Sequence, residues 1–107
     1  MTGEDMLLRA ADVVAGRRAT YGDPVTAMEA VAKRWSVTLG RQVTAAEVVM
    51  CLIDLKLARL AHDPTYEDGW LDASAYSAIG AEIALGGRPV PKRNANPARR
   101  SVQGGGS

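Results

Sequence analysis

The chain of 107 residues has no phenylalanine, one cysteine and one histidine. A single cysteine, Cys51, cannot form an internal disulfide and excludes a zinc site built from cysteines. The single histidine, His62, likewise excludes the histidine clusters that hold transition metals and the catalytic triad of serine hydrolases. Any metal chemistry would therefore have to rely on carboxylates.

Long apolar runs are also missing. No segment approaches the roughly 20 apolar residues that cross a bilayer. The N-terminus contains Glu4 and Asp5 and is acidic, where a secretion signal would be basic. With 47% apolar and 23% charged residues, the chain suits one domain and cannot hold two independent cores. We therefore expect a single-domain cytoplasmic protein without membrane contact.

Charge is distributed unevenly along the chain. Residues 1–87 carry 8 basic and 12 acidic side chains, whereas residues 88–107 carry 5 basic and no acidic ones. The C-terminal segment also has three prolines and almost no large apolar groups, so burial cannot offset the entropy lost on ordering. We expect a helical domain over 1–87 and a disordered basic tail over 88–107, whose contacts with nucleic acid would be weak and non-specific.

Helical periodicity with capping signals recurs four times, and no window alternates apolar and polar residues as a strand would. The first helix is predicted to begin after Thr2, which can form a capping box with Asp5, and to end at Gly16. The second is predicted to begin at Pro24, after a capping aspartate, and to end near Gly40.

The third predicted helix follows a capping box formed by Thr44 and Glu47. The run over 48–60 is apolar on nearly every side, which places this helix at the centre of the domain. Cys51 lies in this run and is therefore expected to be an inert core thiol.

The fourth helix is predicted from about Glu67 to Leu85, with Thr65 as its cap. It carries few charges and has a ridge of small side chains: Ser74, Ser77, Gly80, Ala81 and Ala84. Such a ridge allows another helix to approach closely, and a domain of this length can hardly cover both this helix and the third. We therefore predict a symmetric homodimer with helix-on-helix contact, and we expect Trp35 and Trp70 in the core or the dimer interface.

Polar side chains gather on the third and fourth predicted helices. Lys56 and Arg59 share one face, and Asp68, Asp72 and Tyr76 follow one another at i+4 positions. If the two helices are antiparallel neighbours, the cations and carboxylates can meet. They would then form either an ion-pair network that fixes the register of the helices or a polar pocket for a ligand.

The segment from Arg17 to Pro24, between the first two helices, is the second candidate site. It combines two guanidinium groups with the ring of Tyr21 and leads into a helix N-terminus, which favours anions. Arg18 can hold a phosphate with two parallel hydrogen bonds while Tyr21 stacks on a base. Alternatively, the two arginines satisfy the last carbonyl groups of the first helix.

Four segments in order resemble an uncharacterised small all-α domain of phage and prophage proteins. They are 18–24 (RATYGDP), 32–36 (AKRWS), 55–60 (LKLARL) and 63–76 (DPTYEDGWLDASAY). The resemblance covers roughly residues 4–85, and in that family a histidine usually occupies the place of Tyr66. It implies a phage-type protein in the cytoplasm of a host cell.

The chain is more distantly similar to the all-α nucleoside triphosphate pyrophosphohydrolases of the MazG and dUTPase type. Those enzymes hold Mg²⁺ with a Glu-Glu-x-x-Glu helix and a following Glu-x-x-Asp helix, and they cleave between the α- and β-phosphates. The similarity implies a MazG-like four-helix bundle. Its five ligand places are occupied here by Leu55, Lys56, Arg59, Gly69 and Asp72. Only Asp72 matches, and a cationic side chain cannot bind Mg²⁺.

The leading hypothesis is a homodimeric nucleotide-binding protein that binds a phosphorylated nucleoside without a cofactor, a metal or a catalytic residue. Seven side chains are expected to form the ligand site: Arg18, Tyr21, Lys56, Arg59, Asp68, Asp72 and Tyr76. The cations would contact phosphates, Tyr21 would stack on the base, and the aspartates would orient the cations or the sugar.

Two alternatives to this hypothesis remain open. The first is an Mg²⁺-dependent pyrophosphohydrolase with a rearranged ligand set of Glu47, Asp54, Asp68 and Asp72. The second is a small protein-interaction module, such as one that blocks a host defence, in which the ion pairs are structural. Nucleotide binding that survives EDTA would favour the leading hypothesis over both.

Overall fold

The structure is a computed structural model that describes residues 1–86. Its four helices are α1 (Gly3–Tyr21), α2 (Pro24–Leu39), α3 (Ala45–His62) and α4 (Glu67–Ala84). Residues 1–86 contain no strand, which confirms the predicted all-α fold of four helices. The predicted tail over 88–107 lies outside the described residues.

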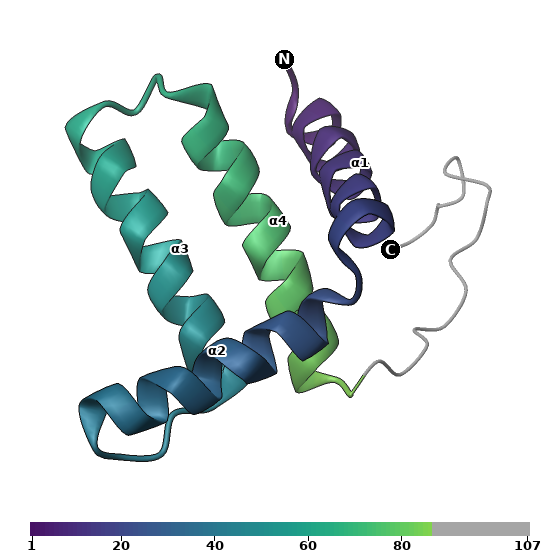
Figure 1. The fold of residues 1–107 in the computed structure, drawn as a ribbon. Coiled ribbons are helices and arrows are strands. Elements are labelled where there is room, and N and C mark those ends of the chain that lie inside the picture. The colour runs from purple at the N-terminus through teal and green to yellow at the C-terminus, as the bar shows by residue number, and fades with distance from the viewer. Residues whose placement is uncertain (87–107) are drawn as a thin grey trace, which may run out of the picture.

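Three helices lie side by side, and α2 crosses one end of the layer that they form (Figure 1). α4 is in the middle, antiparallel to α3 on one side and parallel to α1 on the other. The prediction that α3 would be the central helix was therefore wrong. Among the helices of residues 1–86, α3 packs mainly against α2 and α4, and the side chains of Met50, Leu55 and Leu57 remain about half exposed.

Side-chain caps account for where α1, α2 and α3 begin. Thr2 and Thr44 each accept a backbone N–H, and Asp5 and Glu47 each accept one in return, so both predicted capping boxes form. The backbone hydrogen bond from Thr44 lowers the pKa of Glu47, although burial partly opposes it. At α2, the carboxylate of Asp23 accepts backbone hydrogen bonds from the first turn. These caps are local, which explains why the sequence predicts them correctly.

α1 does not end at Gly16, where the sequence predicts its end, but continues to Tyr21. A glycine inside a helix costs only about 1 kcal/mol relative to alanine, and the residues after Gly16 favour a helix. The helix stops at Gly22, whose φ of 89° is accessible to glycine and unfavourable for other residues. The segment that begins at Arg17 is therefore the end of α1 and not a loop.

The predicted cap of α4 is also wrong. Tyr66 is the N-cap residue, and no side chain caps the helix. The hydroxyl of Thr65 donates to Asp63 at 2.6 Å, and its backbone N–H donates to the same carboxylate oxygen at 3.0 Å. Asp63 thus holds Thr65 in a local turn, which competes with the capping geometry.

The core within residues 1–86 is small. Its buried hydrophobic side chains are Ala10, Ala32, Val43, Val48, Val49, Leu60, Leu71, Ala75 and Ile79, none larger than leucine. Cys51 is exposed and is not the core thiol that the sequence predicts, because it lies on the side of α3 opposite Val49 and Leu60, which pack against α4. None of the four helices has the length and apolar character needed to cross a membrane.

The two tryptophans differ in their surroundings. Trp35 is partly buried and packs against the core cluster of Ala32, Val43 and Val48. Trp70 is 46% exposed, and its indole N–H donates to the carbonyl of Pro64 at 2.9 Å. The sequence predicts both rings in the core or in a dimer interface. Trp35 packs against the core, and Trp70 does not lie in it.

Candidate functional site

The antiparallel packing of α3 and α4 brings Lys56 and Asp72 together, as the sequence predicts. Lys56 Nζ lies 2.9 Å from Asp72 Oδ2, and the two side chains are only 15% and 20% exposed. Arg17 of α1 approaches the other oxygen, Asp72 Oδ1, at 3.7 Å. Asp72 therefore links three helices through one carboxylate.

Arg59 and Asp68 do not join this cluster. No ion pair connects either of them to another residue in the part of the chain that the structure describes. Arg59 is rotated about 60° around α3 from Lys56, because three residues turn a helix by about 300°. Among residues 1–86, Lys56 is thus the predicted cation of α3 that forms an ion pair with α4.

A pocket of about 190 Å³ lies where the C-terminal half of α1, the start of α2 and the middle of α4 meet. Its lining is mostly apolar, with polar groups from Arg17, Arg18, Tyr21 and Tyr76. The predicted ligand residues Arg18, Tyr21 and Tyr76 are thus brought together although they belong to two separate candidate clusters in the sequence.

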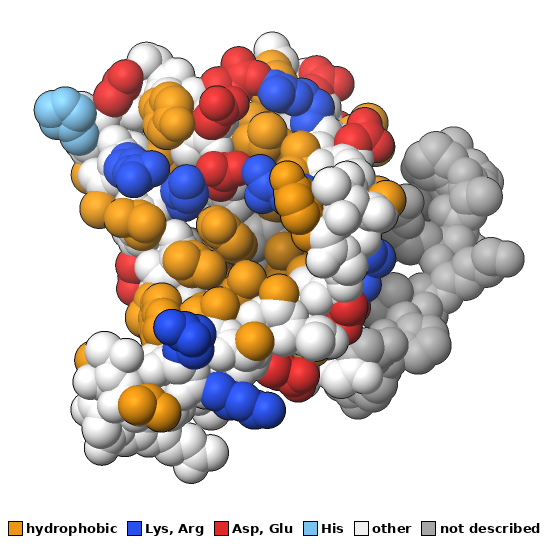
Figure 2. Space-filling view, in the orientation of Figure 1, with side chains coloured by type: hydrophobic (Ala, Val, Ile, Leu, Met, Phe, Trp, Pro, Cys, Tyr) orange, Lys and Arg blue, Asp and Glu red, His pale blue; other side chains and the backbone are white. Residues whose placement is uncertain are grey.

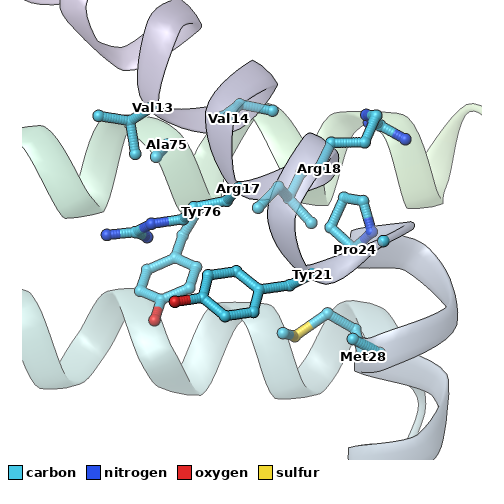
Figure 3. Close-up of a pocket in the computed structure, with 12 residues that line it drawn as sticks. Val13, Val14, Arg17, Arg18, Tyr21, Pro24, Met28, Ala75 and Tyr76 are labelled. Carbon is cyan, nitrogen blue, oxygen red and sulfur yellow. The ribbon is translucent and has the colours of Figure 1, made fainter.

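Figure 3 shows how these side chains are arranged. The phenol groups of Tyr21 and Tyr76 point toward each other, and the guanidinium of Arg17 lies beside Tyr76. Tyr21 is 83% exposed and forms the mouth of the pocket, whereas Tyr76 is partly buried. A planar ring that enters the pocket would meet two phenol rings, and an anion at the mouth would meet the guanidinium.

Arg18 lines the pocket with its aliphatic part, but its guanidinium turns away (Figure 3). It donates to Glu82 at 2.6 Å and to Asp23 at 3.0 Å. The hydrogen bond to Glu82 is the main cause that raises the pKa of Arg18. Both arginines thus reach carboxylates of α4, Arg17 at Asp72 and Arg18 at Glu82, rather than serving only the end of their own helix.

Arg17 is the functional candidate that the predicted ligand set omits. Once α1 is known to continue past Gly16, the spacing gives the signal, because Arg17 and Tyr21 are four residues apart and share one helix face. Met28 of α2 also lines the pocket.

The acids considered for a magnesium site lie apart. Glu47 is at the start of α3, where it caps that helix, and Asp68 is at the start of α4, at the opposite end of the layer. Among residues 1–86, no three Asp, Glu, His or Cys side chains are placed to hold one metal ion.

Figure 2 shows the face of the layer that α2 crosses. Hydrophobic side chains occupy its centre, and acidic and basic side chains surround them. An apolar ligand group with a charged end therefore finds complementary surroundings on this face.

No curated protein and no solved structure matches the chain. Residues 5–84 match a protein family described as a domain of unknown function, DUF6378. The matched region runs from the first turn of α1 to the end of α4, and it agrees with the resemblance to an uncharacterised domain over roughly residues 4–85. Because the match covers all four helices, the chain belongs to the DUF6378 family.

Proposed function

We propose that the chain binds a phosphorylated nucleoside, with the base in the pocket and the phosphate on Arg17. One observation carries this proposal: a single pocket combines two phenol rings with a guanidinium whose ion pair is long, at 3.7 Å. Rings recognise a base by stacking, and a guanidinium recognises a phosphate through parallel hydrogen bonds.

The size of the pocket favours a ligand that is only partly enclosed. Its volume of about 190 Å³ is below the roughly 300–1,000 Å³ of pockets that enclose drug-sized ligands. A base fits this space, while the sugar and phosphate remain at the mouth. Stacking against Tyr21 and Tyr76 would contribute about 1–3 kcal/mol per base.

The charges around Asp72 leave Arg17 available for a phosphate. Lys56 already neutralises Asp72 at 2.9 Å, whereas Arg17 is 52% exposed and more distant. Arg17 can therefore turn toward a ligand without leaving a largely buried carboxylate unpaired, which would cost about 1–3 kcal/mol. Lys56 is in this proposal a supporting residue that keeps Asp72 satisfied.

The surroundings of the other two predicted phosphate-binding arginines narrow the class of ligand. Arg18 would have to abandon two carboxylates to bind a phosphate, and Arg59 lies outside the pocket lining. One guanidinium suits one phosphate group, so we favour a nucleoside monophosphate over a triphosphate. Its binding needs no metal, because Arg17 supplies the positive charge.

The wider relationship belongs to the same proposal. A phage-type protein related to the all-α nucleoside triphosphate pyrophosphohydrolases, with cations at former metal-ligand places, would retain nucleotide binding and lose hydrolysis. Lys56 and Arg59 on α3 occupy places where the related enzymes have metal-binding glutamates, and this supports the proposed relationship.

Calorimetric titration of the full chain in EDTA tests the proposal, using the monophosphates of adenosine, guanosine, cytidine and uridine and the four matching nucleosides. We expect at least one monophosphate to bind at least tenfold more tightly than its nucleoside. Arg17→Ala should abolish this difference. Arg34→Ala, which removes an exposed arginine on α2, is the matched control and should preserve it.

Three results would contradict the proposal: no binding by any of the eight compounds, equal binding of nucleoside and monophosphate, or equal effects of the two arginine substitutions. Binding that appears only when Mg²⁺ replaces EDTA would favour the metal-dependent enzyme instead. Tyr21→Ala provides a further check, since this exposed ring contributes little to the core and its loss should weaken the nucleoside as well.

A further inference from the structure

One side of α4 is covered by no helix of residues 1–86. The side with Gly69 and Gly80 packs on α3, and the side with Ala75 and Ile79 faces the pocket and α1. Residues advance by about 100° around a helix. The remaining side therefore carries Trp70, Ser74, Ser77, Ala81 and Ala84. It points away from the pocket.

This side is more apolar than its sequence suggests. The hydroxyls of Ser74 and Ser77 donate to the carbonyls of Trp70 and Ala73 in the same helix, each at 2.8 Å. Their hydrogen-bonding capacity is thus used within α4, and the serines present mainly their carbon atoms. Trp70, at 46% exposure, adds a large ring at one end.

The neighbouring helix extends the uncharged surface. Met50 and Leu57 are seven residues apart on α3 and are 56% and 46% exposed. They lie opposite Val48, which faces α2, and therefore on the same side of the layer as Trp70. We call the combined surface the ridge face: Met50, Leu57, Trp70, Ser74, Ser77, Ala81 and Ala84.

We propose that the ridge face binds the ridge face of a second copy of the chain, with α4 packed on α4. A symmetric interface places equal surfaces together, so charge on it would oppose like charge. The ridge face contains no ionisable side chain, which removes that penalty. Its small side chains allow the two α4 helices to approach to about 8 Å.

The dimensions also suit a dimer. A helix of 18 residues is about 27 Å long and 10–12 Å wide, so α3 and α4 together present a face of roughly 600 Å². Stable interfaces bury about 600–1,000 Å² per partner. A dimer would also bury Trp70 and Met50 and so enlarge a core whose side chains are no larger than leucine.

Sedimentation equilibrium of the full chain between 5 and 200 µM tests this proposal. We expect a dimer, which Ala81→Glu should convert to a monomer by placing a charge in the centre of the ridge face. Ala58→Glu is the matched control, since it changes an exposed alanine on the outer side of α3 and should leave the dimer intact. Helical circular dichroism shows whether each variant is folded.

A labelling experiment probes the ridge face directly. In a Cys51→Ser background, the thiol introduced by Ala81→Cys should react with a disulfide reagent at least tenfold more slowly at 200 µM than at 1 µM protein. The thiol introduced by Ala58→Cys should react at the same rate at both concentrations. A monomeric wild type, a dimer that survives Ala81→Glu, or a dimer lost through Ala58→Glu would overturn the proposal. These outcomes do not involve Arg17 or a nucleotide, so they are independent of the binding test.

Discussion

α4 makes two interfaces of different kinds. Toward α3, glycines allow close packing, and a Cβ atom at Gly69 would lie 2.8 Å from Leu60 Cδ2, while one at Gly80 would lie 3.2 Å from Val49 Cγ1. The Lys56 ion pair with α4 is largely buried in this region. Shape complementarity therefore fixes the position of α3.

Toward α1, long charged side chains make many of the connections. Ion pairs join Arg9 to Glu67, Arg17 to Asp72 and Arg18 to Glu82. The arginines of these pairs are 41–52% exposed, and ion pairs at the surface contribute about 0–1 kcal/mol each. The pocket lies on this side of α4, where α1, α2 and α4 meet. The comparison indicates that one interface of α4 holds the fold while the other leaves room for a ligand.

The largest expected difference between the two interfaces concerns their apolar residues. Leu60 is buried at the junction of α3 and α4, and Leu60→Ala should lower the free energy of unfolding by about 2–5 kcal/mol through lost contacts and a cavity. Val13→Ala, on the side of α1 that lines the pocket beside α4, should lower it by only about 1 kcal/mol, because this side chain is partly buried. Urea unfolding at one protein concentration measures both, and equal losses would remove the distinction.

Glycines should also respond in opposite directions. Gly69→Ala gains about 1 kcal/mol of helix propensity but forces a contact with the buried Leu60 that costs about 1–3 kcal/mol, so a net loss of about 1 kcal/mol is expected. Gly16→Ala has no atom within 4 Å of the new Cβ and should stabilise α1 by about 0.5–1 kcal/mol. Thermal unfolding of the two variants should shift to lower and higher temperature, respectively; shifts of the same sign would show that packing at Gly69 is not limiting.

The two cations paired with Asp72 should have different roles: Lys56 should contribute mainly to stability and Arg17 mainly to ligand binding. Lys56→Ala leaves a largely buried carboxylate with only the distant Arg17 and should cost about 1–2 kcal/mol. Arg17→Ala should cost less than about 0.5 kcal/mol but should weaken the monophosphate. Urea unfolding and calorimetry on both variants form the test. Loss of binding through Lys56→Ala, in a folded protein, would reassign that lysine from support to ligand contact.

Local signals explain what the sequence predicts well. The caps at Thr2, Asp23 and Thr44 depend on residues within one helical turn, and all three helices begin where these caps indicate. The short connection between α3 and α4 allows the antiparallel packing on which the predicted meeting of cations and carboxylates depends, and Lys56 and Asp72 do pair in the structure.

Non-local packing explains the errors. The end of α1 depends on whether Gly16 or Gly22 breaks the helix, and only Gly22 adopts a positive φ. With the end of α1 predicted at Gly16, nothing places Arg17 on the same helix face as Tyr21, so the predicted ligand set omits Arg17. Tyr21 and Tyr76 were both named, but their meeting depends on α1 lying beside α4, which no local pattern specifies.

The smallest expected effect is a pH dependence carried by the helix caps on the two sides of α4. The Thr26 hydroxyl is the main cause that lowers the pKa of Asp23, near α1, and the Thr44 backbone N–H is the main cause for Glu47, on α3. The ordinary pKa values of these two carboxyl groups are 3.8 and 4.5. Because the pKa values are lower in the folded protein, the folded form binds these protons more weakly than the unfolded form does. The stabilisation is complete above those ordinary values and is lost as the pH falls through the lower folded ones.

Unfolding in urea should therefore show a contribution from these caps that is constant between pH 7 and pH 5 and declines as the pH approaches 3. Asp23→Asn keeps a capping side chain, since asparagine is as good a cap as aspartate, but it removes the titration and one of the two carboxylate partners of Arg18. Glu47→Gln removes the titration on the α3 side alone. In each variant, the free energy of unfolding should decrease less steeply between pH 5 and pH 3 than in the wild type. A larger flattening from Asp23→Asn would show that the charge-dependent α1 side loosens first in acid, whereas a steeper curve in either variant would contradict the assigned direction.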